Sequence, residues 1–386
     1  MTCLEHAPEL DPAVRATVHA RAGELLPPRT GGQVEELAKA GEMVLELLPA
    51  PGDLTENEAA ATVRTAAQVG GARALELIAR FAPDGRFRVR QEIASGWRQF
   101  DTREYADAVL SRTLLEGVQL PVHTADEVAE LGRLAGVDRL HLSWNGPLPA
   151  EVTALRGLDN LVLFQNTHLT GLEPLTAFEE LSSLGLYHCY ELRDLGALTA
   201  LPLDSLTLAS LQDGLDLRPL AELPLTSLSL NFQPIGLRRV ADLPAPDGLQ
   251  WLGLFEAVRG VGLDGLERWS GLTGLSVSGS AQFAEFCRRP VSPALTGLQV
   301  IEAEVVARAL LPHGQLERVT LGYCEAPDGL AALAGLPALS RLALYGSGSY
   351  DVSPLAPLDG LVIEIGHGAE VHGTETVPPE RLVYLP

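Results

Sequence analysis

One short apolar pattern recurs along most of the chain and constrains its fold more than any other feature. Aliphatic residues occupy the first, fourth and sixth positions of L-x-x-L-x-L, as in Leu158-x-x-Leu161-x-Leu163. Twelve copies follow one another about 22 residues apart. Their middle residues are 118, 140, 161, 184, 206, 228, 252, 275, 298, 319, 342 and 361. One copy is too short to enclose a core, so we predict that the copies stack and share one.

Alternation within each copy predicts a short strand. The last two apolar residues lie two positions apart and therefore point to the same face, and the residue between them points to the other. Between the strands the apolar spacing changes to three, as in Leu192, Leu195, Leu198 and Leu201. A period of three favours 3₁₀ turns over α-helices. Two connecting segments depart from it, Ala281–Arg289 and Glu302–Leu311, and there we predict short α-helices.

The pattern and its spacing resemble the leucine-rich-repeat superfamily over about 270 residues. The resemblance implies an α/β fold, a right-handed solenoid whose parallel strands form a concave sheet. It also implies a buried Asn or Cys three residues past the last strand leucine, hydrogen-bonded to the loop backbone. Asn145, Asn166, Cys189 and Cys324 hold that position. We interpret them as structural residues because a buried polar group in a turn satisfies backbone atoms.

The two ends of the array are expected to be capped, because terminal leucines would otherwise meet water. Residues 1–112 are predicted to form a helical, HEAT-like domain, residues 113–365 the solenoid, and residues 366–386 a C-terminal cap or tail. Proline, glycine and aspartate separate the expected helices. These are Asp11–Leu26, Gln33–Leu48, Glu56–Val69, Ala72–Phe81, Val89–Phe100 and Thr102–Leu110.

Composition argues against several classes of function. The formal net charge of −22 argues against binding nucleic acid through a basic face. No apolar run of 18 residues and no signal-peptide layout is present, so we expect no membrane contact and a cytoplasmic location. The four cysteines form no C-x-x-C pair, which leaves a zinc ribbon or redox motif unsupported.

Motifs for catalysis are also missing from the sequence. The single lysine, Lys39, lies in Ala-Lys-Ala and not in a P-loop, and neither G-x-S-x-G nor H-E-x-x-H occurs. His141 and His188 fall on the outward strand face, where a metal or catalytic role is conceivable. Without a partner cysteine or convergent carboxylate, we interpret both as surface residues. The expectation is a chain that is not an enzyme and holds no cofactor or metal.

Aromatic residues on the outward strand face are the strongest candidates for binding. Eight of the twenty aromatic residues (4 Trp, 7 Tyr, 9 Phe) occupy outward positions, although leucines already fill the inner face. Exposed aromatic anchors are typical of binding hot spots. An alternative is that neighbouring rings only stack and stabilise the sheet. The predicted concave-face ligand-binding residues are Trp144, Phe164, Tyr187, His188, Phe232, Trp251, Phe255, Glu256, Glu302, Arg318, Tyr323 and Tyr345.

Acidic residues outnumber basic ones on the same outward face. Glu302, Glu317 and Glu364 are among the acids, and Arg139, Arg318 and Arg341 are the bases. A protein partner that offers Arg or Lys around an apolar patch would match this surface. We therefore expect a protein ligand with a basic and apolar surface.

A second resemblance covers the segment before the repeats. Gly41–Pro51, Ala60–Ala67 and Arg90–Tyr105 resemble the helical segment that precedes the repeats in actinobacterial NACHT-type (STAND) ATPases, which are bacterial relatives of NOD-like immune receptors. The resemblance implies the sensor half of such a protein, with an NTPase as an upstream domain or separate partner, in antiphage-like immunity or signalling. This sequence contains no NTPase motif, so no catalytic residue of the family carries over.

Three hypotheses remain from the sequence. The first is a sensor that regulates a linked or separate NTPase, and the second is a constitutive protein-interaction scaffold. The third is an enzyme with an unrecognised site, in which His141 or His188 would be needed for turnover.

Overall fold

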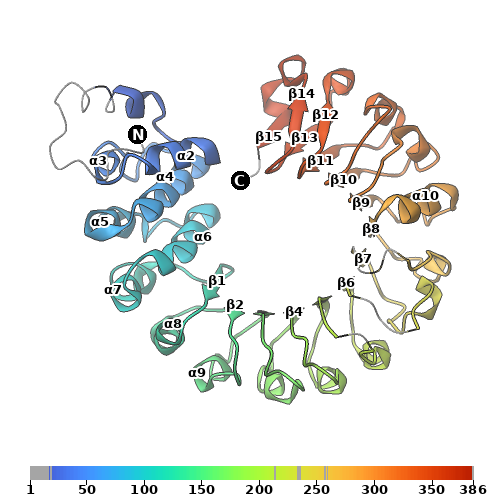
Figure 1. Ribbon diagram of the computed structural model, residues 1–386, viewed down its shortest axis with the longest axis horizontal. Helices are drawn as coiled ribbons and strands as arrows, with labels where there is room; N and C mark the ends of the chain where they lie inside the picture. The colour runs from blue at the N-terminus through green and yellow to red at the C-terminus, as the bar shows by residue number, and fades with distance from the viewer. Residues whose placement is uncertain are drawn as a thin grey trace. The chain divides into compact units, whose positions relative to one another are not determined.

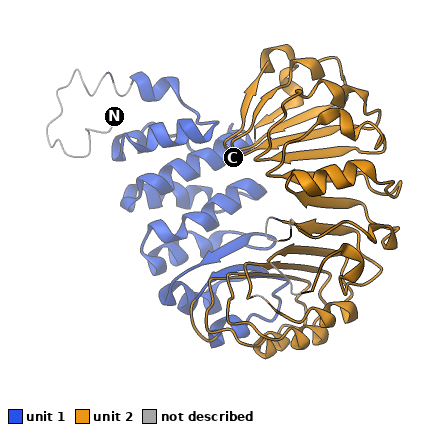
Figure 2. Ribbon diagram, turned by 45° about the vertical axis from the view of Figure 1, so that its right-hand side comes forward, with its two compact units in different colours: residues 1–144, 148–162 blue, residues 145–147, 163–386 orange. Residues whose placement is uncertain are grey.

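The computed structural model describes residue 17 and residues 20–212, 214–232, 236–255, 258 and 260–384. The chain divides into two compact units (Figure 2). Unit 1 comprises Met1–Trp144 and Leu148–Val162, and unit 2 comprises Asn145–Pro147 and Leu163–Pro386. Each unit is described below by itself.

Parallel strands are the recurring element, and their order in the sheet follows the chain. Within the described residues the order is β1 to β11, then β13 and β15, while β12 and β14 form a separate pair. The bounds are β1 Gln119–Val122, β2 Arg139–Ser143, β3 Asn160–Phe164, β4 Ser183–Tyr187, β5 Ser205–Ala209, β6 Ser227–Asn231, β7 Trp251–Leu254, β8 Gly274–Ser278, β9 Gly297–Ile301, β10 Arg318–Gly322, β11 Arg341–Tyr345, β12 Ser349–Asp351, β13 Val362–Ile365, β14 Glu370–His372 and β15 Leu382–Tyr384.

The strand register in unit 2 confirms the predicted stacking of the copies. Leu184 pairs with Leu206, and Leu206 pairs with Leu228, so equivalent leucines stand side by side. These residues are at most 1% exposed. Side chains between them face the other side of the strands, which is the inner side of unit 2 in Figure 1. The fold is therefore the predicted leucine-rich-repeat solenoid.

The register differs from the prediction at both ends of the array. In the first copy Leu120, not Val118, pairs with Leu140. In the twelfth copy Ile363, not Leu361, pairs with Leu342. Both errors are shifts of two residues, which keep every side chain on its own face, so alternation alone cannot reveal them. The predicted C-terminal cap also contributes a further strand, β15, which pairs with β13.

Turns of 3₁₀-helix connect most strands of unit 2, as the period of three predicts. The segment Ala281–Arg289 is helical as expected, in α10 Ser280–Arg288. The helix predicted over Glu302–Leu311 is wrong, because only Ala307–Leu310 is helical and it is 3₁₀. The 3₁₀ turns are η4 Glu173–Ala177, η5 Gly196–Ala200, η6 Arg218–Glu222, η7 Val240–Asp242, η9 Leu266–Arg268, η10 Ala307–Leu310, η11 Ala331–Gly335, η12 Ser353–Leu355, η13 Thr374–Thr376 and η14 Pro379–Arg381.

Just past the strands, a left-handed residue recurs in unit 2. Five non-glycine residues there have φ between 50° and 58°, and they are Gln165, His188, Ser210, Glu302 and Tyr323. Each donates its backbone N–H to a carbonyl of the next repeat, as His188 does to Ala209 at 3.0 Å. This added hydrogen bond offsets the conformational cost of the left-handed backbone, which is about 1 kcal/mol.

Three of the four Asn and Cys residues predicted to be buried in the turns of unit 2 are buried and contact loop backbone as expected. Asn166 is 1% exposed and donates Nδ2–H to the Gly146 carbonyl at 2.9 Å. The Cys324 thiol is also buried and donates to the carbonyls of Val300 and Gly322. Cys189 is fully buried as well, beside the Tyr187 carbonyl.

Asn145 is an exception to that rule. It is exposed, and its Oδ1 accepts hydrogen bonds from the backbone N–H and the hydroxyl of Thr167. The prediction that Asn145 is buried is therefore wrong. Its side chain does accept a hydrogen bond from loop backbone, as expected.

Unit 1 begins with helices, as predicted for the N-terminal part. Glu56–Val69 is helical as expected, whereas the single helix predicted over Gln33–Leu48 is interrupted between two shorter ones. Most of the helix predicted over Asp11–Leu26 lies outside the described residues. The helices are α2 Gly31–Ala38, α3 Glu42–Leu45, α4 Glu56–Val69, α5 Gly71–Phe81, α6 Phe87–Gly96, α7 Thr102–Ala108, α8 Ala125–Glu130 and α9 Ala150–Thr153, with 3₁₀ turns η1 Trp97–Gln99, η2 Leu110–Arg112 and η3 Leu131–Arg133.

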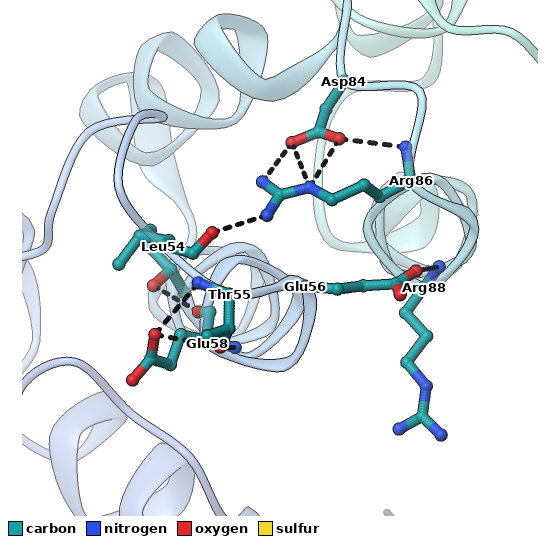
Figure 3. Close-up of polar contacts among 8 residues, drawn as sticks. Leu54, Thr55, Glu56, Glu58, Asp84, Arg86 and Arg88 are labelled. Atoms are coloured by element: carbon teal, nitrogen blue, oxygen red, sulfur yellow. Dashed lines mark hydrogen bonds and ion pairs between the residues drawn. The ribbon is translucent and has the colours of Figure 1, made fainter.

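Polar contacts join the loops that precede α4 and α6 (Figure 3). Arg86 forms a two-pronged ion pair with Asp84 and donates to the Leu54 carbonyl at 2.6 Å. Beside it, Glu56 accepts the backbone N–H of Arg88 at 2.9 Å. The Arg86–Leu54 and Arg88–Glu56 contacts therefore join the start of α4 to the start of α6.

The helical part of unit 1 continues directly into its first strand. The Gln91 side chain on α6 donates to the Gln119 carbonyl and accepts the Gln119 N–H on β1. Arg90, also on α6, is buried and donates to the carbonyls of Leu114 and Glu116. Helix α6 therefore satisfies the backbone at the start of the sheet. The domain boundary at residue 112 stays a prediction.

Among the described residues, none of the helices is both long enough and apolar enough to cross a lipid bilayer.

Candidate functional site

The inner face of the strands in unit 2 carries most of the predicted ligand-binding residues. Phe164, Tyr187, Trp251, Phe255 and Tyr345 are partly exposed, and Tyr323 is 55% exposed. Phe232 is only 2% exposed, so its prediction as a surface residue is wrong. Glu256 lies outside the described residues. Several rings of this face therefore remain open to solvent, while the leucines fill the core.

Phe232 follows the last residue of strand β6. The side chain there is not held on the open face by strand alternation, since β6 ends at Asn231. A large apolar ring at such a position gains about 2 kcal/mol by turning into the core.

Four rings form a cluster where β3 and β4 end. Phe164 lies 6.3 Å from Tyr187 and 5.1 Å from His188, measured between ring centroids. His188 Nδ1 lies 2.6 Å from the hydroxyl of Tyr190, which is 49% exposed. Tyr190 was not among the predicted residues, because it comes after the strand and its turn. Only the left-handed backbone at His188 brings it back to this cluster.

Trp251 and Phe255 lie against glycines of the sheet. Trp251 pairs in register with Gly274, and a Cβ on Gly274 would collide with the Trp251 ring. A Cβ on Gly253 would lie 2.9 Å from the Phe255 ring. Both rings therefore have one face on the sheet, so part of their role is to pack. This packing supports the alternative interpretation for one face of each ring, namely that the rings stabilise the sheet.

Tyr323 and Tyr345 form a second ring pair near β10 and β11. Their centroids are 5.8 Å apart and the rings are nearly perpendicular, at 89°. A Cβ on Gly346 would lie 2.6 Å from the Tyr323 ring, and one on Gly322 would collide with Tyr345. The Tyr345 hydroxyl accepts a hydrogen bond from Gln299 at 2.9 Å, and burial raises the pKa of Tyr345. These contacts hold the Tyr323 and Tyr345 rings in a perpendicular arrangement.

Arginines of the same face are paired with carboxylates of this chain. Arg341 contacts Glu364 at 3.0 Å, and Arg318 contacts Glu317 at 3.6 Å. Glu302 is exposed and follows β9 at the position that Tyr323 holds after β10. Because the arginines are matched by acids, the surface keeps its acidic character near Tyr323.

Small residues occupy the inner face of β5 and β6. Ser205 pairs with Ser227, and Thr207 pairs with Ser229. On β8 the prediction of open side chains is wrong for Ser276 and Ser278, which are fully buried and whose hydroxyls have no hydrogen-bond partner among the described atoms. Phe255 is seated on Gly253, the register partner of Ser276, and this ring helps to cover the strand.

Trp144 belongs to unit 1 and is partly exposed past the end of β2. On the same strand, His141 lies with its ring centroid 6.1 Å from that of His123. Burial lowers the pKa of both histidines, and the charge of His123 lowers the pKa of His141 further. In unit 2, burial also lowers the pKa of His313.

These lowered values predict loss of stability in mild acid. A histidine with a lowered folded-state pKa is protonated first in the unfolded chain, so acidification below the unfolded value of about 6.5 favours unfolding. We expect the free energy of unfolding to fall as pH drops from 7.5 to 5.5, and His141→Gln to reduce that fall. Urea titrations across this range measure both. A wild-type slope for His141→Gln would contradict the prediction.

The described part of the chain was considered next for side chains that could bind a metal ion. No group of three His, Cys, Asp or Glu there is placed to hold a metal ion. His141 and His188 lie in different units and contact other rings.

Two features of this site were not predicted from the sequence. Gln299 supports Tyr345 from two repeats away, and glycines lie beneath the rings. A signal for the second feature was present, because Gly274 follows Trp251 by 23 residues, about one repeat, and Gly346 follows Tyr323 by the same number.

Comparisons with known proteins return leucine-rich-repeat structures. No protein-family model matches the sequence, and no curated protein matches it. An internalin from Listeria monocytogenes is 16% identical, with 72% of this chain and 82% of that chain covered and a TM-score of 0.38. A leucine-rich-repeat protein from Leptospira interrogans is 19% identical, with 69% and 71% covered and a TM-score of 0.35. The functional domain of InlJ from Listeria monocytogenes is 15% identical, with 78% of each chain covered and a TM-score of 0.31. The fold assignment rests on the repeats and strand register of this chain.

Proposed function

We propose that this protein is a non-catalytic recognition module that binds a protein partner on the inner face of its strands. The observation that carries the proposal is the set of partly exposed rings on that face, namely Phe164, Tyr187, Trp251, Phe255, Tyr323 and Tyr345. The core needs none of them, because buried leucines fill it. Rings that are held rigidly lose little entropy on binding, which is what interface anchors require.

The proposed partner presents basic and apolar side chains. The chain as a whole has a net charge of −22, and the arginines of the inner face are already paired. Complementary charge increases the association rate and disfavours acidic partners.

We further propose that recognition regulates a NACHT-type NTPase in the cytoplasm, in antiphage-like immunity or signalling. Support comes from the sequence resemblance of Gly41–Pro51, Ala60–Ala67 and Arg90–Tyr105. In unit 1 helix α6 hydrogen-bonds to the first strand through Gln91 and to the segment before that strand through Arg90, so a change at the strand can be passed to the helix.

Affinity capture from extracts of the native host tests the proposal. The full chain serves as bait beside a Trp251→Ala/Phe255→Ala protein and a Leu311→Ala protein, and captured proteins are quantified by mass spectrometry. We expect a partner whose yield falls at least about tenfold with the double variant, as loss of hot-spot rings predicts. Leu311 is 44% exposed and lies beyond the turn η10, away from the strands, so its replacement should leave capture unchanged.

The outcomes separate the hypotheses. Equal capture by all three baits would contradict the use of the inner face. An NTPase recovered with the chain, together with a second protein captured only after the cell is challenged, is expected of a sensor. A stable partner without any challenge, and without an NTPase, would favour the constitutive scaffold.

Folding of the double variant must be measured in the same experiment. Both rings are partly exposed, so we expect a loss of only about 1–2 kcal/mol in unfolding free energy. Complete unfolding would show that the two rings serve the sheet and not a partner.

A further inference from the structure

Strand β8 turns small side chains to the inner face, and they are buried there. Strand alternation points Gly274, Ser276 and Ser278 to this face. Leu275 and Val277, which lie between them, are fully buried in the core on the opposite side. Both serines are 0% exposed as well. Side chains from elsewhere in the sheet must therefore cover this row of small residues.

Two rings from the preceding repeat lie over this region. An added Cβ on Gly274 would collide with the Trp251 ring, so that ring lies on the first residue of the row. An added Cβ on Gly253, the register partner of Ser276, would lie 2.9 Å from the Phe255 ring. Phe255 follows the end of β7, and a phenyl ring makes no hydrogen bond that would hold it. It can turn about its Cα–Cβ bond without disturbing the sheet.

The two serine hydroxyls are buried without hydrogen-bond partners among the described atoms. Such groups destabilise a folded protein, and proteins keep them mainly where function requires them. The neighbouring Gln282 shows the usual outcome, since its equally buried amide has three partners. It accepts the Ser278 N–H at 3.0 Å and donates to the carbonyls of Val258 and Val261. The two hydroxyls are therefore an exception that calls for a ligand.

The spacing of these hydroxyls matches the main chain of an extended segment. Ser276 and Ser278 are two residues apart on a strand, which separates their Cα atoms by about 6.7 Å. In any extended chain, carbonyl groups two residues apart point the same way with the same spacing. A segment that lies along β8 can therefore accept both hydroxyl hydrogens at once. The small side chains of the row leave room for its backbone to approach.

We infer that Ser276 and Ser278 form the hydrogen-bonding floor for an extended segment of the bound protein, and that Phe255 turns aside to admit it. This inference rests on the proposed function and specifies which part of the partner lies on β8. In the free protein the Phe255 ring helps to shield the hydroxyls. In the complex the segment takes the place of the ring, and two new hydrogen bonds offset the lost ring contact.

A titration with a strand-forming peptide tests the floor directly. The probe is acetyl-Arg-Val-Thr-Val-Thr-Val-Arg-amide, whose β-branched residues favour an extended chain. The control peptide carries α-aminoisobutyric acid in place of each valine, which keeps the charge but favours a helix. Binding to the full chain is followed by ligand-observed NMR. We expect the control peptide to bind at least about tenfold more weakly, because a helix uses its carbonyls internally.

Substitution of the serines should move binding and stability in different directions. The Ser276→Ala/Ser278→Ala protein should raise the Kd of the strand-forming peptide at least about tenfold, since two hydrogen bonds are lost. Its urea midpoint should equal or exceed that of wild type, because the hydroxyls have no partner to lose in the free protein. Ser205→Ala is the matched control, since Ser205 lies partly exposed on the inner face of β5 and should change neither quantity.

Several outcomes would overturn the inference. They are no binding of the strand-forming peptide to wild type, equal binding of the two peptides, and an unchanged Kd in the serine variant. A lower urea midpoint in that variant would also overturn it, because the hydroxyls would then be satisfied within the fold.

The serine variant also separates this inference from the proposed function. Partner capture that is unchanged in Ser276→Ala/Ser278→Ala but lost in Trp251→Ala/Phe255→Ala would overturn the serine floor alone. Capture that is unchanged in both proteins would overturn the proposed function.

Discussion

Replacing Gly265 with alanine is expected to destabilise unit 2 by about 3 kcal/mol. Gly265 precedes the 3₁₀ turn η9 with a left-handed backbone, φ 91°. A Cβ there would meet the backbone of Ala241 in the preceding repeat, with the Cα at 2.6 Å and the nitrogen at 2.8 Å. Backbone cannot rotate away as a flexible side chain can, so the two repeats must separate or the turn must change its conformation.

A nearby glycine provides the matched control. At Gly271 no neighbouring atom lies within 4 Å of the position that a Cβ would take. Urea denaturation of Gly265→Ala and Gly271→Ala should therefore give a large loss for the first and a change within about 0.5 kcal/mol for the second. Equal stability of the two proteins would show that the close approach between Gly265 and Ala241 is not present in solution.

Replacing Arg381 with methionine should cost about 3 kcal/mol and open the C-terminal end of the sheet. Arg381 is 7% exposed, and its guanidinium donates to three backbone carbonyls. The acceptors are Leu361 at 2.8 Å, Ala356 at 2.9 Å and Leu355 at 3.2 Å. Methionine would fill much of the same space but would leave these buried carbonyls without a donor.

Hydrogen–deuterium exchange can show where this effect acts. We expect faster exchange in β13 and β15 of the Arg381→Met protein, together with the lower unfolding free energy. Arg381→Lys should be intermediate, because an ammonium cannot span all three carbonyls. Arg308→Met serves as the control, since the Arg308 side chain is 75% exposed and lies 3.7 Å from Asp328. Unchanged exchange in β13 would contradict the capping role of Arg381.

Much of the fold followed from the spacing of apolar residues. The period of about 22 residues gave the repeats, alternation gave the strands, and the period of three gave the 3₁₀ turns. Predictions failed where period two is ambiguous, as in the two-residue shifts at Leu120 and Ile363. They also failed for Glu302–Leu311, whose apolar pattern suits a helix but whose first residues pair with the neighbouring repeat through Glu304.

The candidate site was predicted only as a surface. Sequence alternation placed Trp251, Tyr323 and Tyr345 on the inner face, but it could not show which rings would meet. Contacts across repeats decide that, because they depend on left-handed residues after the strands and on glycines one repeat away. Phe232 shows the limit of alternation, since its side chain is buried just where the strand ends.

By itself, the sequence determined the repeat, its leucine core and the face on which rings and acids gather, because these depend on local periodicity. Only the tertiary structure decided that the rings of Tyr323 and Tyr345 stand perpendicular to each other and that Arg381 donates to the carbonyls of Leu355, Ala356 and Leu361. Such contacts join residues one or more repeats apart, and their geometry depends on backbone conformation between strands, which residue spacing does not specify.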